Sequence, residues 1–119
     1  MERRKSSSSF ETFVTDQLSE LGTVTSRKMF GGVGLYCDEL FFGLIARDQL
    51  YLKVDDRTRG FFERAGCTPF RPFLDRPGTM KYYSVPVEVL ESARELVEWA
   101  RRAVAAAARA SDAKSSKRS

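Results

Sequence analysis

The sequence predicts an α+β domain in two layers, with helices packed on an antiparallel meander sheet of about five strands. Apolar residues recur at helical intervals near the N-terminus and again after residue 86. Between these regions, strand-like segments are joined by short polar links, which antiparallel neighbours allow and parallel neighbours do not. The length of 119 residues fits a single domain with its own core.

The first predicted helix opens with the capping-box spacing of Ser8 and Glu11 and ends near Gly22. Its buried stripe consists of Phe10, Phe13, Val14, Leu18 and Leu21. The period then becomes strand-like, and the predicted strands are Val24–Met29, Val33–Cys37, Leu40–Ala46 and Leu50–Val54. The links at 38–39 and 47–49 have the length of hairpin connections, so these strands form a meander.

In the second half of the chain, the sequence predicts a short helix, one more strand and a long helix. Asp55 and Asp56 cap the short helix, and Gly66 closes it. Prolines make residues 67–78 a loop with at most an edge strand. Residues 79–85 follow as a strand, and Pro86 begins a final helical region. The predicted division is a disordered basic segment, a folded domain and a disordered basic tail, at residues 1–9, 10–108 and 109–119.

The net charge of +4 and the pI near 9.3 come from the two ends of the chain, so the folded part is close to neutral. Flexible basic segments bind polyanions weakly and without sequence preference. The alternative is that these ends only keep the protein soluble. The candidate nonspecific polyanion contacts are Arg3, Arg4, Lys5, Lys114, Lys117 and Arg118.

The residue types exclude several kinds of chemistry. The chain has no histidine, which removes the commonest general base and the commonest zinc ligand. Cys37 and Cys67 are not spaced as a redox pair, so we expect free thiols. The carboxylate pairs at 38–39 and 55–56 fall at turn and cap positions. We therefore expect no catalytic residues, no cofactor, no metal and no enzymatic activity.

The glycines at positions 31, 32 and 34 allow two interpretations. A phosphate loop needs a third glycine at the fingerprint spacing and a following helix, or a trailing Lys-Ser or Lys-Thr, and this block has neither. Glycine also marks a turn or bulge between strands. We expect this structural role, in a turn within the meander.

Tyr51, Lys53, Lys81 and Tyr83 form a candidate partner or nucleic-acid face if the strand at 79–85 pairs with the strand at 50–54. Aromatic residues interleaved with lysines stack bases and hold phosphates on RNA-binding sheets. The alternative is a half-exposed sheet surface or a dimer contact. We expect a homodimer, because the aromatic surface to be covered is large.

The chain is expected to be cytoplasmic and to have no membrane partner. No apolar run approaches the ~20 residues of a membrane span. Serines follow the basic N-terminus, where a signal peptide would have an apolar core.

Several motifs, in one order, resemble those of the TfoX/Sxy N-terminal domain over about residues 10–104. The block from Arg27 to Tyr36 opens the match, and the segments at 50–55, 80–86 and 96–100 continue it. The matching residues, expected to be structural, are Arg27, Met29, Phe30, Gly31, Gly32, Gly34, Tyr36, Lys53, Gly66, Pro69, Phe70, Tyr82, Tyr83, Pro86 and Trp99. The fuller regulators of this kind carry a second, helical domain, so we expect a single-domain member.

The resemblance implies an α+β domain similar to secretion-chaperone-like folds and an association with bacterial competence, where full-length relatives act as transcriptional co-activators. The leading hypothesis is a non-enzymatic regulatory domain that works through protein–protein contacts, with a transcription-regulatory protein as a partner. A nucleic-acid-binding accessory protein that uses the basic tails and the sheet face is the first alternative. An enzyme of unrecognised type is the second.

Overall fold

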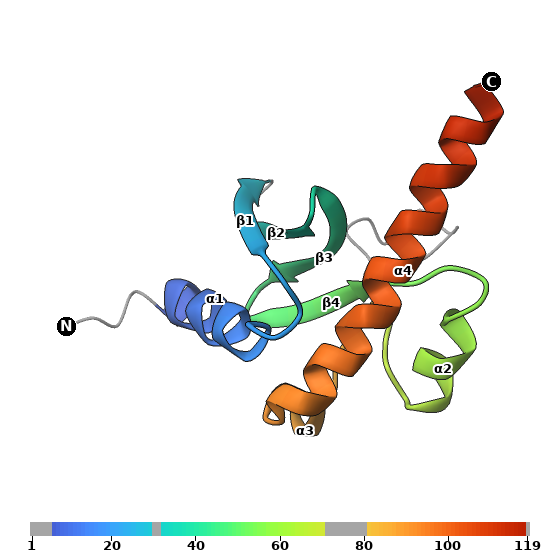
Figure 1. The fold of residues 1–119 in the computed structure, drawn as a ribbon. Helices are drawn as coiled ribbons and strands as arrows, with labels where there is room; N and C mark the ends of the chain where they lie inside the picture. The colour runs from blue at the N-terminus through green and yellow to red at the C-terminus, as the bar shows by residue number, and fades with distance from the viewer. Residues whose placement is uncertain (1–5, 30–31, 71–80, 119) are drawn as a thin grey trace.

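The computed structural model describes the backbone of residues 6–29, 32–70 and 81–118. Helices pack on one face of a twisted antiparallel sheet, so the predicted α+β fold is confirmed (Figure 1). The elements are α1 (Ser6–Gln17), β1 (Val24–Met29), β2 (Gly32–Cys37), β3 (Leu40–Ala46), β4 (Gln49–Lys53), α2 (Arg59–Arg64), β5 (Tyr82–Ser84), α3 (Val87–Leu90) and α4 (Ala93–Arg118).

The sheet has five strands in the order β1-β2-β3-β4-β5, and each pair is antiparallel. Two-residue turns join β2 to β3 and β3 to β4. Asp38 and Glu39 have φ of 51° and 68°, and Arg47 and Asp48 have φ of 53° and 59°. Left-handed conformations at both turn residues match the right-handed twist of the flanking strands, which explains how such short polar links close the meander.

A β-bulge in β3 decides which side chains enter the core. Leu35 of β2 lies opposite Gly43, whereas the next residue, Tyr36, lies opposite Phe41. Phe42 is therefore the extra residue of the bulge. Its side chain is completely buried, while Phe41 is half-buried on the other face of the sheet.

The core lies between the sheet and the helices. α4 runs across β3 and β4, and α1 contacts α4 beside it (Figure 1). Leu50 and Leu52 of β4 and Val54, just after this strand, face the core and are at most 2% exposed. On α4, small side chains let the helix approach the sheet closely. Fully or almost fully buried positions of α4 are Leu96, Val97, Ala100, Ala103, Ala106 and Ala107.

The predicted ends of the helices need correction. α1 begins at Ser6, so the predicted disordered segment is wrong for residues 6–9, and residues 1–5, with Arg3, Arg4 and Lys5, lie outside the described residues. The helical region after Pro86 is divided at Ser92, whose Oγ accepts a hydrogen bond from the Glu95 N–H at 3.2 Å and caps α4.

α4 continues to Arg118, so the prediction of a disordered tail at 109–119 is wrong for residues 109–118. The alanine-rich sequence has high helix propensity, and neither glycine nor proline interrupts it. Lys114, Lys117 and Arg118 therefore belong to the last turns of α4. These turns extend beyond the sheet (Figure 1).

Candidate interaction face of the sheet

The predicted pairing of the fourth and fifth strands is correct, but the predicted set of four side chains does not share one face. Lys53 lies opposite Tyr82, and Leu52 lies opposite Tyr83. Tyr51 and Lys53 therefore share a face with Tyr82, while Tyr83 points to the core side and is 5% exposed. A shift of one residue in strand register exchanges the two faces, and the sequence pattern alone did not fix this register.

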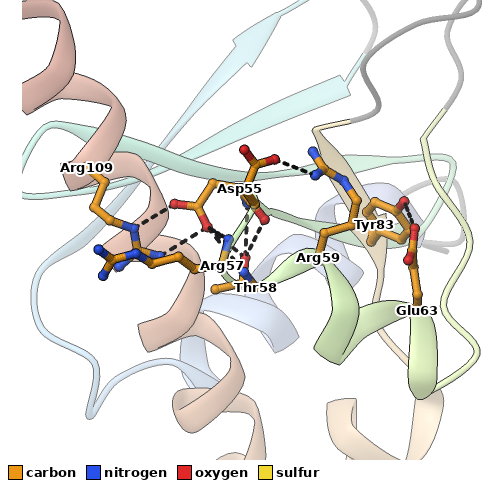
Figure 2. A network of polar contacts seen from close by, with 8 residues as sticks. Asp55, Arg57, Thr58, Arg59, Glu63, Tyr83 and Arg109 are labelled. Atoms are coloured by element: carbon orange, nitrogen blue, oxygen red, sulfur yellow. Dashed lines mark hydrogen bonds and ion pairs between the residues drawn. The ribbon is translucent and has the colours of Figure 1, made fainter.

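The two remaining members of the predicted set have other surroundings. The Tyr83 hydroxyl donates a hydrogen bond to Glu63 Oε2 at 2.8 Å, as Figure 2 shows. Burial is the main cause that raises the pKa of Tyr83. Lys81 is exposed just before β5, and its carbonyl accepts a hydrogen bond from the Val54 N–H at 2.8 Å.

The sheet face opposite the helices, here called the outer face, carries a row of aromatic rings that ends in a cation on each side. This aromatic row consists of Arg27, Tyr36, Phe41, Tyr82 and Lys53. The Arg27 guanidinium lies over the Tyr36 ring, 5.0 Å from its centroid. The ring centroids of Tyr36 and Phe41 are 5.1 Å apart, and those of Phe41 and Tyr82 are 5.7 Å apart. Lys53 Nζ lies 5.1 Å from the Tyr82 centroid.

The phenol of Tyr82, next to Lys53 in the row, is uncharged. Burial, followed by the nearby Tyr36, raises the pKa of Tyr82 to about 12, so its phenol stays protonated near neutral pH. Cation–π contacts of this kind contribute about 0.5–1 kcal/mol each at exposed sites. A second ring pair, Tyr51 and Phe70, lies with centroids 4.8 Å apart and adds to the aromatic surface next to β5.

Gly34 makes room for the row. A Cβ at this position would lie 2.6 Å from Met29 Cε and 3.0 Å from Phe41 Cε1. At Gly32, a Cβ would lie 2.5 Å from the carbonyl oxygen of Ile45 in the neighbouring strand. Close approach between strands and side chains thus explains these two glycines. The predicted turn, at residues 30–31, lies outside the described residues.

A polar network fastens α4 to the start of α2 (Figure 2). Arg109 donates from Nε to Asp55 Oδ2 at 2.7 Å and from a terminal nitrogen to Asp55 Oδ1 at 3.1 Å. Asp55 Oδ1 also accepts hydrogen bonds from the backbone N–H groups of Arg57 and Thr58. These two N–H groups belong to the turn before α2, and the N-cap of α2 is Thr58, which makes no side-chain cap hydrogen bond, so the predicted cap role of Asp55 and Asp56 is wrong. The ion pair of Asp55 with Arg109 was not predicted from the sequence.

Asp55→Asn should lower the free energy of unfolding by about 1–2 kcal/mol near neutral pH. The Arg109 hydrogen bond is the largest cause that lowers the Asp55 pKa to about 2, from its usual 3.8. A lowered carboxyl pKa stabilises the folded state above the unfolded pKa, so this contribution should fade as pH falls from about 4 toward 2. Urea denaturation of both proteins between pH 7 and pH 2 measures it.

Asp56→Asn is the matched control for that experiment. Asp56 pairs with Arg59 at 2.9 Å, but its side chain is fully exposed. Its replacement should leave the stability near that of the unmodified protein at every pH. Equal effects of the two substitutions would show that the Asp55–Arg109 pair adds nothing specific.

The other residues predicted as a structural signature lie at positions that shape the fold. Gly66 has φ of 82° and ends α2, where its N–H donates to Glu63 and the following N–H donates to Phe62. Pro69 forms an isolated bridge with Tyr83 at the edge of the sheet. Pro86 precedes the first turn of α3, and Trp99 of α4 packs against the rings of Phe61 and Phe62. Phe30 and Gly31 are outside the described residues.

The described residues outside the row offer little reactive chemistry. Cys37 is buried and Cys67 is half-buried, both are free thiols, and burial is the main cause that raises the pKa of each. Among the residues that the structure describes, no cluster of three or more acidic or cysteine side chains could hold a metal ion. In the same part of the chain, no helix combines the length and apolar content needed to cross a bilayer.

Sequence reasoning named Tyr36, Tyr82, Arg27 and Lys53 as signature residues but did not bring them together. Phe41, at the centre of the row, was not singled out. Phe41 and Phe42 are adjacent, and without knowledge of the bulge the sequence does not show which of the two faces the core. The alternation of aromatic and basic residues on adjacent strands was the available signal, and it needed the correct register to be used.

The comparisons with known proteins agree with this architecture. The family model of the TfoX N-terminal domain matches residues 16–107. The chain is also 29% identical to the DNA transformation protein TfoX1 of Aliivibrio fischeri, over an alignment of 89 residues that covers 68% of this chain. The match spans 43% of that relative, so the chain corresponds to less than half of its length. The match over most of the folded part shows that this chain belongs to the TfoX N-terminal domain family.

Proposed function

We propose that this chain is a non-enzymatic regulatory domain of the cytoplasm that acts through protein–protein contacts in bacterial competence or a related transcriptional response. Membership of the TfoX N-terminal domain family supports the regulatory role, as does likeness to a protein named a DNA transformation protein. Because the match covers 43% of that relative, its whole activity is proposed here only as the setting in which this domain works.

The aromatic row is the observation that carries the proposal. Aromatic side chains and arginine are enriched at protein–protein interfaces, and large rings supply much of the binding energy there. The rings of the row are half-buried against one another, and a cation lies over the ring at each end. Such a surface is already ordered before a partner arrives, which lowers the entropy that binding loses.

The homodimer expected from the sequence is part of the same proposal. Two rows that cross at Phe41 would cover each other's aromatic centres and keep the four cations apart. Light-scattering mass across a dilution series should give a dimer that dissociates on dilution, and Phe41→Glu should give a monomer at every concentration. The matched control is Phe13→Glu, on an α1 residue that is 39% exposed, which should leave the dimer intact. A strict monomer of the unmodified protein at the highest concentration would contradict the dimer.

A nucleic-acid-binding role is the second candidate, because the row combines aromatic rings with cations as single-strand-binding surfaces do. The near-neutral charge of the folded part favours the protein-binding role instead. Fluorescence anisotropy with single-stranded and duplex DNA at low and high salt separates the two. DNA binding that is lost in both Tyr36→Ala and Tyr82→Ala would support the second candidate. No observation on the described residues favours an enzyme, and we do not propose one.

A further inference from the structure

The two edge strands of the sheet, β5 and β1, differ in whether further backbone hydrogen bonds cover them. At the β5 edge, the Ser84 N–H donates to the Thr68 carbonyl and the Phe70 N–H donates to the Tyr82 carbonyl, each at 2.8 Å. At the other edge, β2 is the one strand of the described residues that pairs with β1 (Val24–Met29). Among the described residues, no backbone hydrogen bond is made to the edge of β1 that points away from β2. The row of N–H and carbonyl groups along such an edge is a template for a further strand.

The positive charge of β1 favours some partner strands over others. Arg27 and Lys28 are adjacent and exposed, and the strand itself contains no acidic residue. The nearby carboxylate of Glu11 on α1 is already engaged, since its Oε2 accepts a hydrogen bond from Ser26 Oγ at 2.7 Å. Basic residues on an edge oppose pairing with a second copy of the same strand. The same residues attract an acidic strand, because opposite charges across a pair of strands stabilise it.

We infer that the open edge of β1 binds an extended acidic segment of a partner protein, which adds to the sheet as a further strand. Main-chain hydrogen bonds supply the affinity in this mode of recognition, and side chains at alternate positions supply the specificity. On the side of the sheet that faces the helices, the carboxylates of the segment lie next to Lys28. On the outer face, its other side chains adjoin Arg27 at the end of the aromatic row. The inference rests on the proposed function only in that the partner is a protein, and it names the chemistry of that partner.

The test uses the full chain and a labelled synthetic peptide of alternating valine and glutamate. Anisotropy at low salt should show binding that weakens as salt rises, because the contact includes exposed charges. Lys28→Glu should weaken binding roughly fivefold, as expected for reversing one exposed charge at an interface. Lys81→Glu makes the same change in an exposed lysine beside the opposite edge and should leave binding unchanged. Amide hydrogen exchange should show new protection in β1 when the peptide is present.

Two further peptides decide between an added strand and simple charge attraction. A version with methylated backbone nitrogens keeps the carboxylates but loses main-chain donors, so it should fail to bind. A version with lysine in place of glutamate should also fail. Absence of binding by the acidic peptide, or equal binding of either control peptide, would overturn the inference. Protection of β1 that rises with protein concentration alone would show instead that a second copy occupies the edge. Because Phe41→Glu removes the proposed dimer without touching β1, failure of the dimer and failure of strand addition can be told apart.

Discussion

Phe62→Ala is expected to lower the free energy of unfolding by about 3–5 kcal/mol, because it removes a large side chain from the centre of the core. Phe62 is completely buried. Its ring centroid lies 5.1 Å from that of Trp99 on α4 and 6.3 Å from that of Tyr83 on β5. The side chain therefore joins α2 to both layers of the domain, and these layers cannot close over the space that alanine leaves without moving the sheet or α4. Trp99 is the only tryptophan, so its fluorescence in a urea titration reports the unfolding directly.

Phe61→Ala is the matched control for this measurement. Phe61 is the preceding residue of the same helix and also contacts Trp99, with centroids 4.9 Å apart, but it is half-buried and the Arg102 guanidinium covers it at 3.9 Å from the ring centroid. We expect its loss to cost about 1–2 kcal/mol, since water already reaches part of the ring. If the two substitutions had equal effects, Phe62 would not hold the central position assigned to it.

The order and direction of the strands could be predicted from the sequence, because both depend on local signals. The links at 38–39 and 47–49 are too short for anything but antiparallel neighbours. The bounds of Leu40–Ala46 agree with the structure for the same reason, since the polar residues Glu39 and Arg47 flank it, and the bounds of Val24–Met29 agree as well. The left-handed backbone that Asp38 and Glu39 adopt in their turn is the local consequence of joining such closely paired strands.

The faces of the strands could not be predicted, because they depend on single-residue shifts that the apolar pattern does not show. The bulge at Phe42 sends Phe41 to the outer face, and the register of β5 sends Tyr83 to the core and Tyr82 to the row. The bulge lies within a hairpin, whereas the register of β5 joins segments far apart in the sequence. The ion pair of Asp55 with Arg109 could not be predicted either, because it joins residues 54 positions apart.

The largest expected effect within the glycine-rich block belongs to Gly32. Gly32→Ala should lower the free energy of unfolding by about 2–3 kcal/mol, as overpacking in a well-packed region does. The added Cβ would lie 2.5 Å from the Ile45 carbonyl oxygen and 3.8 Å from the Ala46 Cα. These are backbone atoms that cannot rotate away, so β2 and β3 would have to separate. The loss should appear as a lower urea midpoint in equilibrium denaturation.

Gly34→Ala is the informative comparison, because its added Cβ meets side chains and not the backbone. The nearest atoms are Met29 Cε at 2.6 Å, Phe41 Cε1 at 3.0 Å and Met29 Sδ at 3.1 Å. Met29 can adopt another rotamer, so we expect a cost of about 1 kcal/mol or less. Met29→Ala should reduce the cost of Gly34→Ala but leave that of Gly32→Ala unchanged, which a double-mutant cycle measures. A Gly34→Ala protein less stable than the Gly32→Ala protein would contradict this account, since the tightest constraint on the block would then be the aromatic row and not the spacing of β2 from β3.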